Sequence, residues 1–169
     1  MVWPEPAHVD ALVDLMRPED REALDRISGG QSAAVLREGI ARSLYCFTYL
    51  ADEVPLCLGG IIDIGTVLAP DGLVWLVVQP DVERHKKRFL RESRRQMAIM
   101  LDIMPVLRNA ERTCEGKGLR WLKWLGFEIG ERMLINGESM VPITMRAVIG
   151  RDFSRTVPIT DRKTAPDGR

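Results

Sequence analysis

Apolar residues in the first part of the chain recur every three or four positions, which is the spacing of a helix with one buried face. This spacing predicts a helix over residues 8–17, and residues 20–27 could continue it after a kink at Pro18. Two adjacent glycines then interrupt the pattern. A further helix is expected over residues 32–44, again with its apolar residues on one side.

The spacing then changes to one that is typical of strands. Residues 46–50, 56–64 and 73–78 are rich in β-branched and aromatic side chains and are separated by short turns. They predict three consecutive antiparallel strands, and the third is apolar on both faces, as expected at the centre of a sheet. Gly59 and Gly60 in the second strand indicate a bulge or a close approach of two backbones.

The longest predicted element is a helix over residues 81–104, which Asp81 can cap after Pro80 has ended the preceding strand. A single apolar stripe runs along this helix for about six turns. The stripe consists of Val82, Phe89, Leu90, Met97, Leu101 and Met104.

The remaining sequence predicts a strand, a short helix and a terminal hairpin. The strand is expected over residues 106–112 and the helix over residues 118–125. Two further strands, over residues 127–135 and 139–148, are joined by an Asn-Gly pair, which is typical of a tight hairpin turn.

These elements together predict an α+β fold with a mixed, mostly antiparallel sheet and about four helices packed on both of its faces. The strands on either side of the long helix should be parallel neighbours, because a crossover connection returns to the same sheet. Residues 1–149 are expected to form one domain, and residues 150–169 a polar C-terminal tail.

The distribution of charge adds a preferred location for a charged ligand. The chain has 169 residues with 24 basic and 24 acidic side chains, so no overall field attracts it to nucleic acid or to a membrane. Residues 5–25 carry seven acidic side chains, and residues 83–95 carry seven basic ones. A charged ligand is therefore expected near the second segment.

Other features of the composition exclude several classes of protein. Three widely spaced cysteines form no disulfide framework, which suits a reducing compartment, and Cys114 is expected to be a buried structural thiol. The sequence has no signal peptide at its start and no apolar run as long as a membrane helix, which predicts a cytosolic protein. His8 and His85 are isolated, so no metal site is expected.

One run of residues resembles a known family. The segment Leu119–Phe127 reads Leu-Arg-Trp-Leu-Lys-Trp-Leu-Gly-Phe and ends in the Leu-Gly-Phe that GNAT (acetyltransferase-like) proteins carry after their fourth helix. With the order of elements over residues 1–148, it resembles the GNAT superfamily. The fuller run, with Trp75–Pro80 and Phe89–Arg94, resembles the GNAT-like proteins of tailed bacteriophages, the group that includes the internal virion protein of podoviruses.

The resemblance implies an acetyl-CoA site at the start of the long helix. GNAT enzymes hold the diphosphate of CoA there with backbone N–H groups of a glycine-rich turn. This chain has no glycine in that segment. Arg84, Lys86 and Lys87 could bind phosphate by charge instead, with Val77 and Val78 beside the cofactor, or the basic residues could form a solvated helix face.

The catalytic groups that the resemblance implies are incomplete. The general acid is usually a tyrosine four residues before the glycine of Leu-Gly-Phe, and that position is Leu122 here. The only tyrosines, Tyr45 and Tyr49, are expected in the second helix and the first strand. Asp63 is the one carboxylate expected within the three consecutive antiparallel strands of residues 46–78, and it is either a general base or a solvated strand end.

Three functional hypotheses follow from the resemblance. The first is a phage-encoded GNAT-fold protein with a degenerate acetyl-CoA site, which acts as a virion-associated or assembly component and contacts other virion proteins through its tail. It would reside in the cytoplasm of the bacterial host or in the phage particle. The second is an active acetyl-CoA-dependent N-acyltransferase. The third is a module that binds a CoA-type or other phosphate ligand without turnover.

Overall fold

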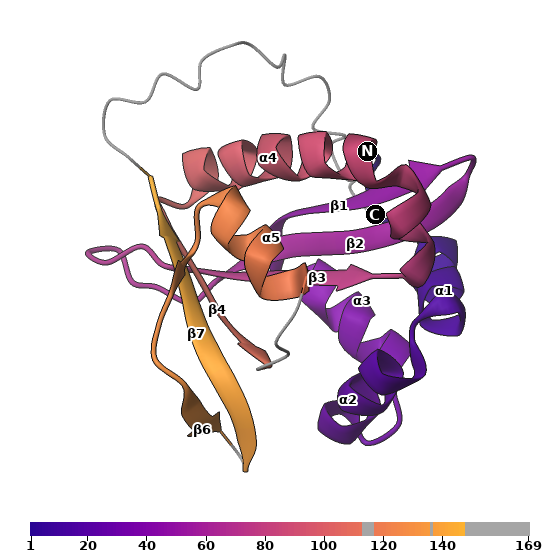
Figure 1. The fold of residues 1–169 in the computed structure, drawn as a ribbon, viewed down its shortest axis with the longest axis horizontal. Helices are drawn as coiled ribbons and strands as arrows, with labels where there is room; N and C mark the ends of the chain where they lie inside the picture. The colour runs from indigo at the N-terminus through magenta and orange to yellow at the C-terminus, as the bar shows by residue number, and fades with distance from the viewer. Residues whose placement is uncertain (113–116, 136, 148–169) are drawn as a thin grey trace, which may run out of the picture.

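The computed structural model describes residues 1–112, 117–135 and 137–147. In this part of the chain, five α-helices and one 3₁₀ helix pack on a seven-stranded sheet (Figure 1). The helices are α1 (Pro6–Leu15), α2 (Pro18–Ser28), α3 (Ser32–Arg42), the 3₁₀ helix η1 (Pro80–His85), α4 (Lys86–Ile103) and α5 (Lys117–Leu125). The strands are β1 (Ser43–Ala51), β2 (Val54–Asp63), β3 (Gly72–Val78), β4 (Val106–Arg112), β5 (Glu128–Ile129), β6 (Met133–Ile135) and β7 (Glu138–Arg146).

The sheet is mixed, and most of its pairings are antiparallel. Its order is β1-β2-β3-β4-β7-β5, and β6 also pairs with β7. Strands β3 and β4, which flank η1 and α4, form the parallel pair. This arrangement confirms the predicted α+β class and the predicted crossover.

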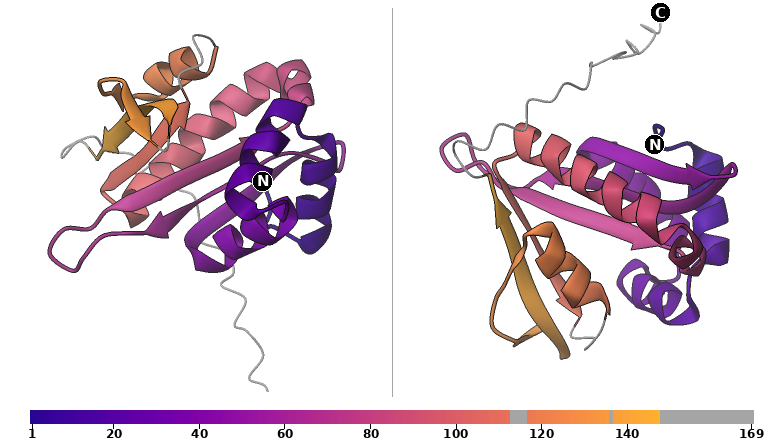
Figure 2. Two further views of the ribbon diagram at one scale, coloured as in Figure 1. Left: turned by 90° about the horizontal axis from the view of Figure 1, so that it is seen from below. Right: turned by 45° about the horizontal axis from the view of Figure 1, so that its top comes forward.

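Helices cover both faces of the sheet. Helices α4 and α5 lie on one face, while α1, α2 and α3 lie on the other and cover β2 and β3 (Figures 1 and 2). Two apolar cores result, and β3 contributes to both, with Val74 in the first and Trp75 in the second. This confirms that the third predicted strand is central. No helix among the described residues combines the length and apolarity needed to cross a membrane.

The first part of the chain differs from the prediction in two places. Pro18 begins a separate helix α2, because its fixed φ suits the first position of a helix. Strand β1 begins at Ser43, so Tyr45 lies in a strand and its predicted place in a helix is wrong. The physical reason is tertiary: the Ser43 hydroxyl donates to the Gly39 carbonyl and accepts the indole N–H of Trp75, which ends α3 early.

The long helix also begins differently from the prediction. Residues Pro80–His85 form η1, and its N-cap is Gln79, so the predicted cap at Asp81 is wrong. The Asp81 carboxylate instead lies 3.6 Å from the Arg84 guanidinium as an ion pair. The buried face of α4 includes the polar residues Ser93 and Gln96 beside the apolar stripe. Gln96 accepts a hydrogen bond of 2.6 Å from the Tyr45 hydroxyl, so the polar position is satisfied inside the molecule.

The strand predicted over residues 127–135 is divided into β5 and β6. Pro142 of β7 has no N–H to donate, and its ring lies where a side chain at Gly130 would be. The Gly130 N–H still donates to the Pro142 carbonyl at 2.8 Å, so the two strands stay attached while the ladder is interrupted. Gly137 has a φ of +81° between β6 and β7, in keeping with the predicted hairpin.

The two glycines of β2 allow close approach of neighbouring strands. A Cβ atom at Gly60 would lie 2.6 Å from the carbonyl oxygen of Tyr45, and one at Gly59 would lie 2.7 Å from a methyl group of Leu76. Both positions are paired in register, because the irregularities of the β1–β2 pairing lie elsewhere. Of the two predicted alternatives, the close backbone approach is therefore confirmed.

The substitution Gly60→Ala is expected to lower the free energy of unfolding by about 1–3 kcal/mol, because the methyl group must displace a neighbouring backbone. Gly118→Ala is the matched control, since its Cβ would meet nothing within 4 Å. Alanine favours a helix, so this change in α5 should raise stability by up to about 1 kcal/mol. Urea unfolding followed by circular dichroism measures both, and an unchanged stability of Gly60→Ala would contradict the close approach.

Candidate functional site

The sheet opens where β3 and β4 separate. Their pairing includes only Gly72 with Leu107 and Leu73 with Arg108, and beyond these pairs the strands diverge. Asn109 lies at the point of divergence, where its side-chain amide donates to the Val74 carbonyl at 2.6 Å. The side-chain oxygen of Asn109, Oδ1, accepts the Ala110 N–H at 2.7 Å. We call the opening between β3 and β4 beyond Asn109 the fork.

The β3 side of the fork presents backbone groups that β4 does not pair. Successive residues of a strand direct their N–H and C=O groups to opposite neighbours. The Val74 carbonyl faces β4, so Leu76 and Val78 face the same side, and neither is included in the pairing with β4. An extended ligand that contains amide groups could pair with these positions as a further strand does.

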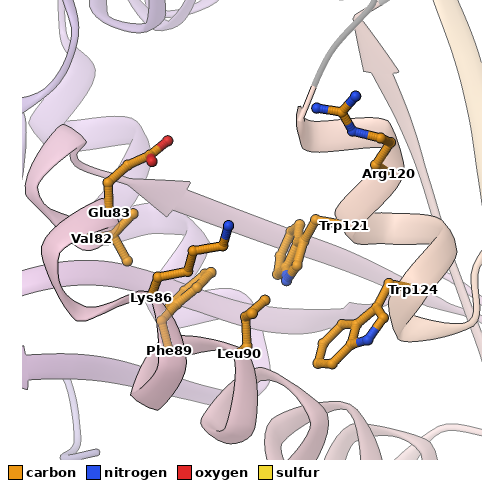
Figure 3. Close-up of a pocket in the computed structure, with 8 residues that line it drawn as sticks. All are labelled: Val82, Glu83, Lys86, Phe89, Leu90, Arg120, Trp121 and Trp124. Carbon is orange, nitrogen blue, oxygen red and sulfur yellow. The ribbon is translucent and has the colours of Figure 1, made fainter.

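A pocket of 350 Å³ adjoins the fork between the start of α4 and helix α5 (Figure 3). It lies near the carboxyl ends of parallel strands, where ligands of open mixed sheets commonly bind. The pocket is lined by Val82 and Glu83 of η1, by Lys86, Phe89 and Leu90 of α4, and by Arg120, Trp121 and Trp124 of α5.

Aromatic rings form the wall where the two helices meet. Phe89 and Trp121 stack with ring centroids 5.5 Å apart, and Phe89 also lies 6.4 Å from the buried ring of Tyr49. The Arg94 guanidinium lies 3.8 Å from the ring centroid of Trp124. The buried indole N–H of Trp121 has no hydrogen-bond partner among the described residues. This wall therefore combines apolar surface with one unused donor.

The basic residues predicted for the site divide into two groups. Lys86 lines the pocket, and Figure 3 shows its side chain reaching towards Trp121. Arg84 has a side chain that is 78% exposed and is paired with Asp81, while Lys87 is exposed and does not line the pocket. Arg120 of α5 supplies a second positive charge in the pocket.

The start of the long helix does not form a turn of free amide groups. Pro80 has no N–H, and the Val82 N–H already donates to the Gln79 carbonyl at 3.2 Å. The following residues continue the 3₁₀ helix, which uses their amides for internal hydrogen bonds. Asp81 and Glu83 add negative charge to the same turn. A diphosphate would therefore depend on side-chain cations such as Lys86.

Leu122, at the position that the resemblance gives to the general acid, belongs to the main core. Its side chain is 7% exposed and packs among residues of α4 and the sheet. Gly126 has a φ of +110° and donates to the Leu122 carbonyl, which ends α5 in the manner predicted. Phe127 is buried in the same core, as expected.

The tyrosines lie away from the fork, in β1. Burial raises the pKa of both hydroxyls, and the charge of Arg88 opposes this shift at Tyr49. Tyr45 donates to Gln96, whereas the buried hydroxyl of Tyr49 has no partner among the described residues. Strand β2 separates both tyrosines from β3, so neither takes the place of an acid at the fork.

The structure does not bring Asp63 to the pocket. Asp63 is paired in register with Gly72, at the opposite end of β3 from Val78, and roughly 20 Å of strand separates the two ends. Its carboxylate is exposed and accepts the Gly65 N–H at 2.9 Å. This contact agrees with a solvated strand end that fixes the adjoining loop.

The cysteines and histidines of the described segments do not form a second site. Burial raises the pKa of the Cys46 thiol to about 11 and that of Cys57 to about 12, which disfavours the nucleophilic thiolate. Cys114 lies outside the described residues. His8 accepts the Glu5 N–H at the start of α1. No group of three histidine, cysteine or carboxylate side chains that could hold a metal ion occurs in the segments described.

Several site residues could not be assigned from the sequence. Trp121 and Trp124 were part of the motif that indicated the fold, but their spacing of three along a helix was the only sign that they share one face. Arg120 and Asn109 carried no comparable sign. Val77 directs its side chain to the second core, while Val78 packs against the first, so their predicted roles depend on their backbone groups.

Asn109→Ala is expected to lower the free energy of unfolding by about 1–3 kcal/mol, because it leaves the Val74 carbonyl without its partner. Lys123→Ala, on the exposed side of α5, is the control and should change stability by less than about 0.5 kcal/mol. Urea unfolding gives both values. Equal stabilities of the two variants would show that the amide contact does not hold the fork.

Comparisons with known proteins give a clear result for the fold. No protein-family model and no curated protein sequence matches the chain. An aminoglycoside 6'-acetyltransferase type Ii superimposes with a TM-score of 0.60 at 14% identity, over 86% of this chain and 94% of that one. A GNAT acetyltransferase from Streptococcus agalactiae gives 0.59 at 12% identity, with coverages of 86% and 93%.

An acetyltransferase from Bacillus subtilis, solved in complex with CoA, gives a TM-score of 0.52 at 11% identity, over 68% of this chain and 84% of that one. At such low identities the likeness establishes the fold and leaves the activity open. The chain has the fold of the GNAT acetyltransferases.

Proposed function

We propose that this chain binds a CoA-type ligand in the fork and its adjoining pocket but lacks the means of ordinary acetyl transfer. The observation that carries the binding is the unpaired edge of β3, where Leu76 and Val78 direct backbone groups into the fork. The pantetheine arm of CoA is an extended chain with amide groups, and such a chain suits an open strand edge. A protein of the same fold has been solved with CoA.

The loss of ordinary turnover is proposed from two other features. A buried leucine, Leu122, occupies the position of the usual acid, so the leaving thiolate would have no side-chain proton donor there. The closed η1 helix and its two carboxylates weaken the hold on a diphosphate. We therefore expect the pantetheine arm to supply most of the affinity, with Lys86 and Arg120 in a secondary role.

Calorimetric titration with CoA and with pantetheine tests this division. Pantetheine should bind within about ten-fold of CoA, a difference of about 1.4 kcal/mol. The substitution Val78→Pro removes an amide that faces the fork and should abolish binding of both. Val78→Ala keeps that amide and is the matched control, with binding retained.

Two outcomes of the titration would contradict the proposal. Absence of binding at millimolar CoA would mean that the fork and its pocket are not a site for a CoA-type ligand. A loss of more than about a hundred-fold on Lys86→Glu, or about 2.7 kcal/mol, would mean that a functional diphosphate site exists after all.

The alternative of an active N-acyltransferase has its own test. Release of free CoA thiol from acetyl-CoA should stay at the uncatalysed rate over a panel of primary amines and aminoglycosides. Saturable thiol release with any of them would establish turnover, with proton transfer through water or the substrate.

We also propose, on the resemblance of Trp121–Phe127 to phage GNAT-like proteins, that the chain is a virion-associated component. Its polar tail, residues 150–169, would contact other virion proteins. Mass spectrometry of purified particles should then detect its peptides at a constant ratio to a capsid protein through successive gradient steps. Loss of the peptides during purification would contradict a place in the particle.

A further inference from the structure

The outer side of α4 carries a compact group of basic side chains. We use the name basic strip for Lys87, Arg88, Arg91, Arg94 and Arg95, all of which are exposed. Figure 1 shows α4 along the upper margin of the molecule, with the sheet beneath it. Phe89 is buried in the main core and Leu90 lines the pocket, so these apolar residues point away from the strip. The strip therefore presents positive charge to the solvent.

The stability of α4 does not explain the basic strip. Lys87 and Arg88 lie in the first turn of the helix, where the peptide dipoles make cations unfavourable. Like charges three or four residues apart repel each other, and Arg91 has four basic neighbours at these spacings. Glu92 lies 3.8 Å from both Arg91 and Arg95, which is too long for a hydrogen bond. The helix thus keeps a repulsive arrangement, and a bound anion would offset the repulsion.

The basic strip consists of two rows. Residues seven apart lie nearly above one another on a helix. Lys87 and Arg94 therefore form one row, Arg88 and Arg95 form the other, and Arg91 lies between them. Adjacent residues are separated by about 100° around a helix axis, so the rows lie along two sides of the exposed surface of α4.

An aromatic ring holds one arginine of each row. The guanidinium of Arg94 lies 3.8 Å from the ring centroid of Trp124 in α5, and that of Arg88 lies 5.7 Å from the ring centroid of Tyr49 in β1. Contact with the face of a ring leaves the guanidinium N–H groups available as donors. Neither arginine forms an ion pair with another residue in the described part of the chain, and nor does Lys87.

The dimensions of the strip suit the phosphates of double-stranded DNA. Residues 87–95 span about 12 Å of helix axis, and the same length of duplex carries about seven phosphate charges. An α-helix is about 10–12 Å in diameter and the major groove is about 12 Å wide, so the two rows could meet phosphates of both strands. Four of the five side chains are arginines, whose planar guanidinium matches the geometry of a phosphate.

Other anionic partners suit the strip less well. Helices that bind a membrane surface add apolar side chains that enter the bilayer, whereas Phe89 and Leu90 face the core and the pocket. Single-stranded nucleic acids stack their bases on aromatic rings, but Arg94 lies over the ring of Trp124. The surface of a soluble protein usually mixes both signs of charge, whereas a duplex is negative along its whole length.

We propose that the basic strip binds the phosphate backbone of double-stranded DNA without reading its sequence. The chain as a whole is neutral, so the attraction is local to α4. A dissociation constant of about 10⁻⁴–10⁻⁶ M is expected for such binding at physiological salt. No residue of the strip lines the pocket, so DNA and a CoA-type ligand would occupy different surfaces.

Fluorescence anisotropy with a labelled DNA duplex of mixed sequence tests the proposal, over a series of salt concentrations and without CoA. A plot of the logarithm of the association constant against that of the salt concentration should have a slope of about −4.5, because each of five neutralised phosphates contributes about −0.9. The double substitution Arg88→Ala and Arg95→Ala removes one row. It should change the slope to about −2.7 and weaken binding more than about ten-fold at about 0.1 M salt.

Arg37→Ala combined with Arg42→Ala is the matched control, because these exposed arginines belong to α3 on the other face of the sheet. The control should leave both the association constant and the slope unchanged. Absence of binding at low salt, or an equal loss in the two double variants, would overturn the proposal. Equal displacement of the duplex by polyglutamate at the same charge concentration would overturn it in favour of an acidic protein. Tighter binding to phosphatidylserine vesicles than to the duplex would overturn it in favour of a membrane.

Discussion

The separation of β3 from β4 is the constraint on which the site depends. In a sheet that was paired throughout, the backbone groups of Leu76 and Val78 would be consumed by the neighbouring strand, and no extended ligand could use them. Asn109 lets the strands part without leaving the Val74 carbonyl unsatisfied at the point of divergence. At the opening, a side-chain hydrogen bond from Asn109 thus replaces one hydrogen bond between the strands. The apolar cores on the two faces of the sheet are kept.

The elements around the fork have clear structural tasks. Helix α5 contributes Leu122 to the core and stacks Trp121 on Phe89, which fixes its position against α4. Helix η1 satisfies its own amides, where an anion-binding turn would leave them open. The same geometry that stabilises this part of the molecule therefore places a buried leucine and already bonded amides where the resemblance implies an acid and an anion-binding turn.

Local signals in the sequence were sufficient for most of the fold. The spacing of apolar residues predicted the central strand and the long helix, and Gly126 predicted the end of α5. Each of these features is determined by residues that are close together in the sequence. The site depended on contacts between distant segments. Asn109 and Val74 are 35 residues apart, so the spacing of residues gives no sign of their contact. The position of Asp63 depends on the end of β3 at which its partner Gly72 lies, and the spacing of residues does not reveal this either. Tyr45 was misplaced for the same reason, since a contact between Ser43 and Trp75 ends the preceding helix.

The burial of Leu122 also restricts how this chain could change over evolutionary time. A tyrosine at this position would be larger than the space that the core provides and would need a partner for its hydroxyl. Strain of about 1–3 kcal/mol is a large part of the stability of an ordinary domain, which is about 5–15 kcal/mol. A single substitution of Leu122 by tyrosine would therefore leave a less stable fold. Compensating changes in the surrounding side chains would have to come first, and until they did, selection for stability would act against the substitution.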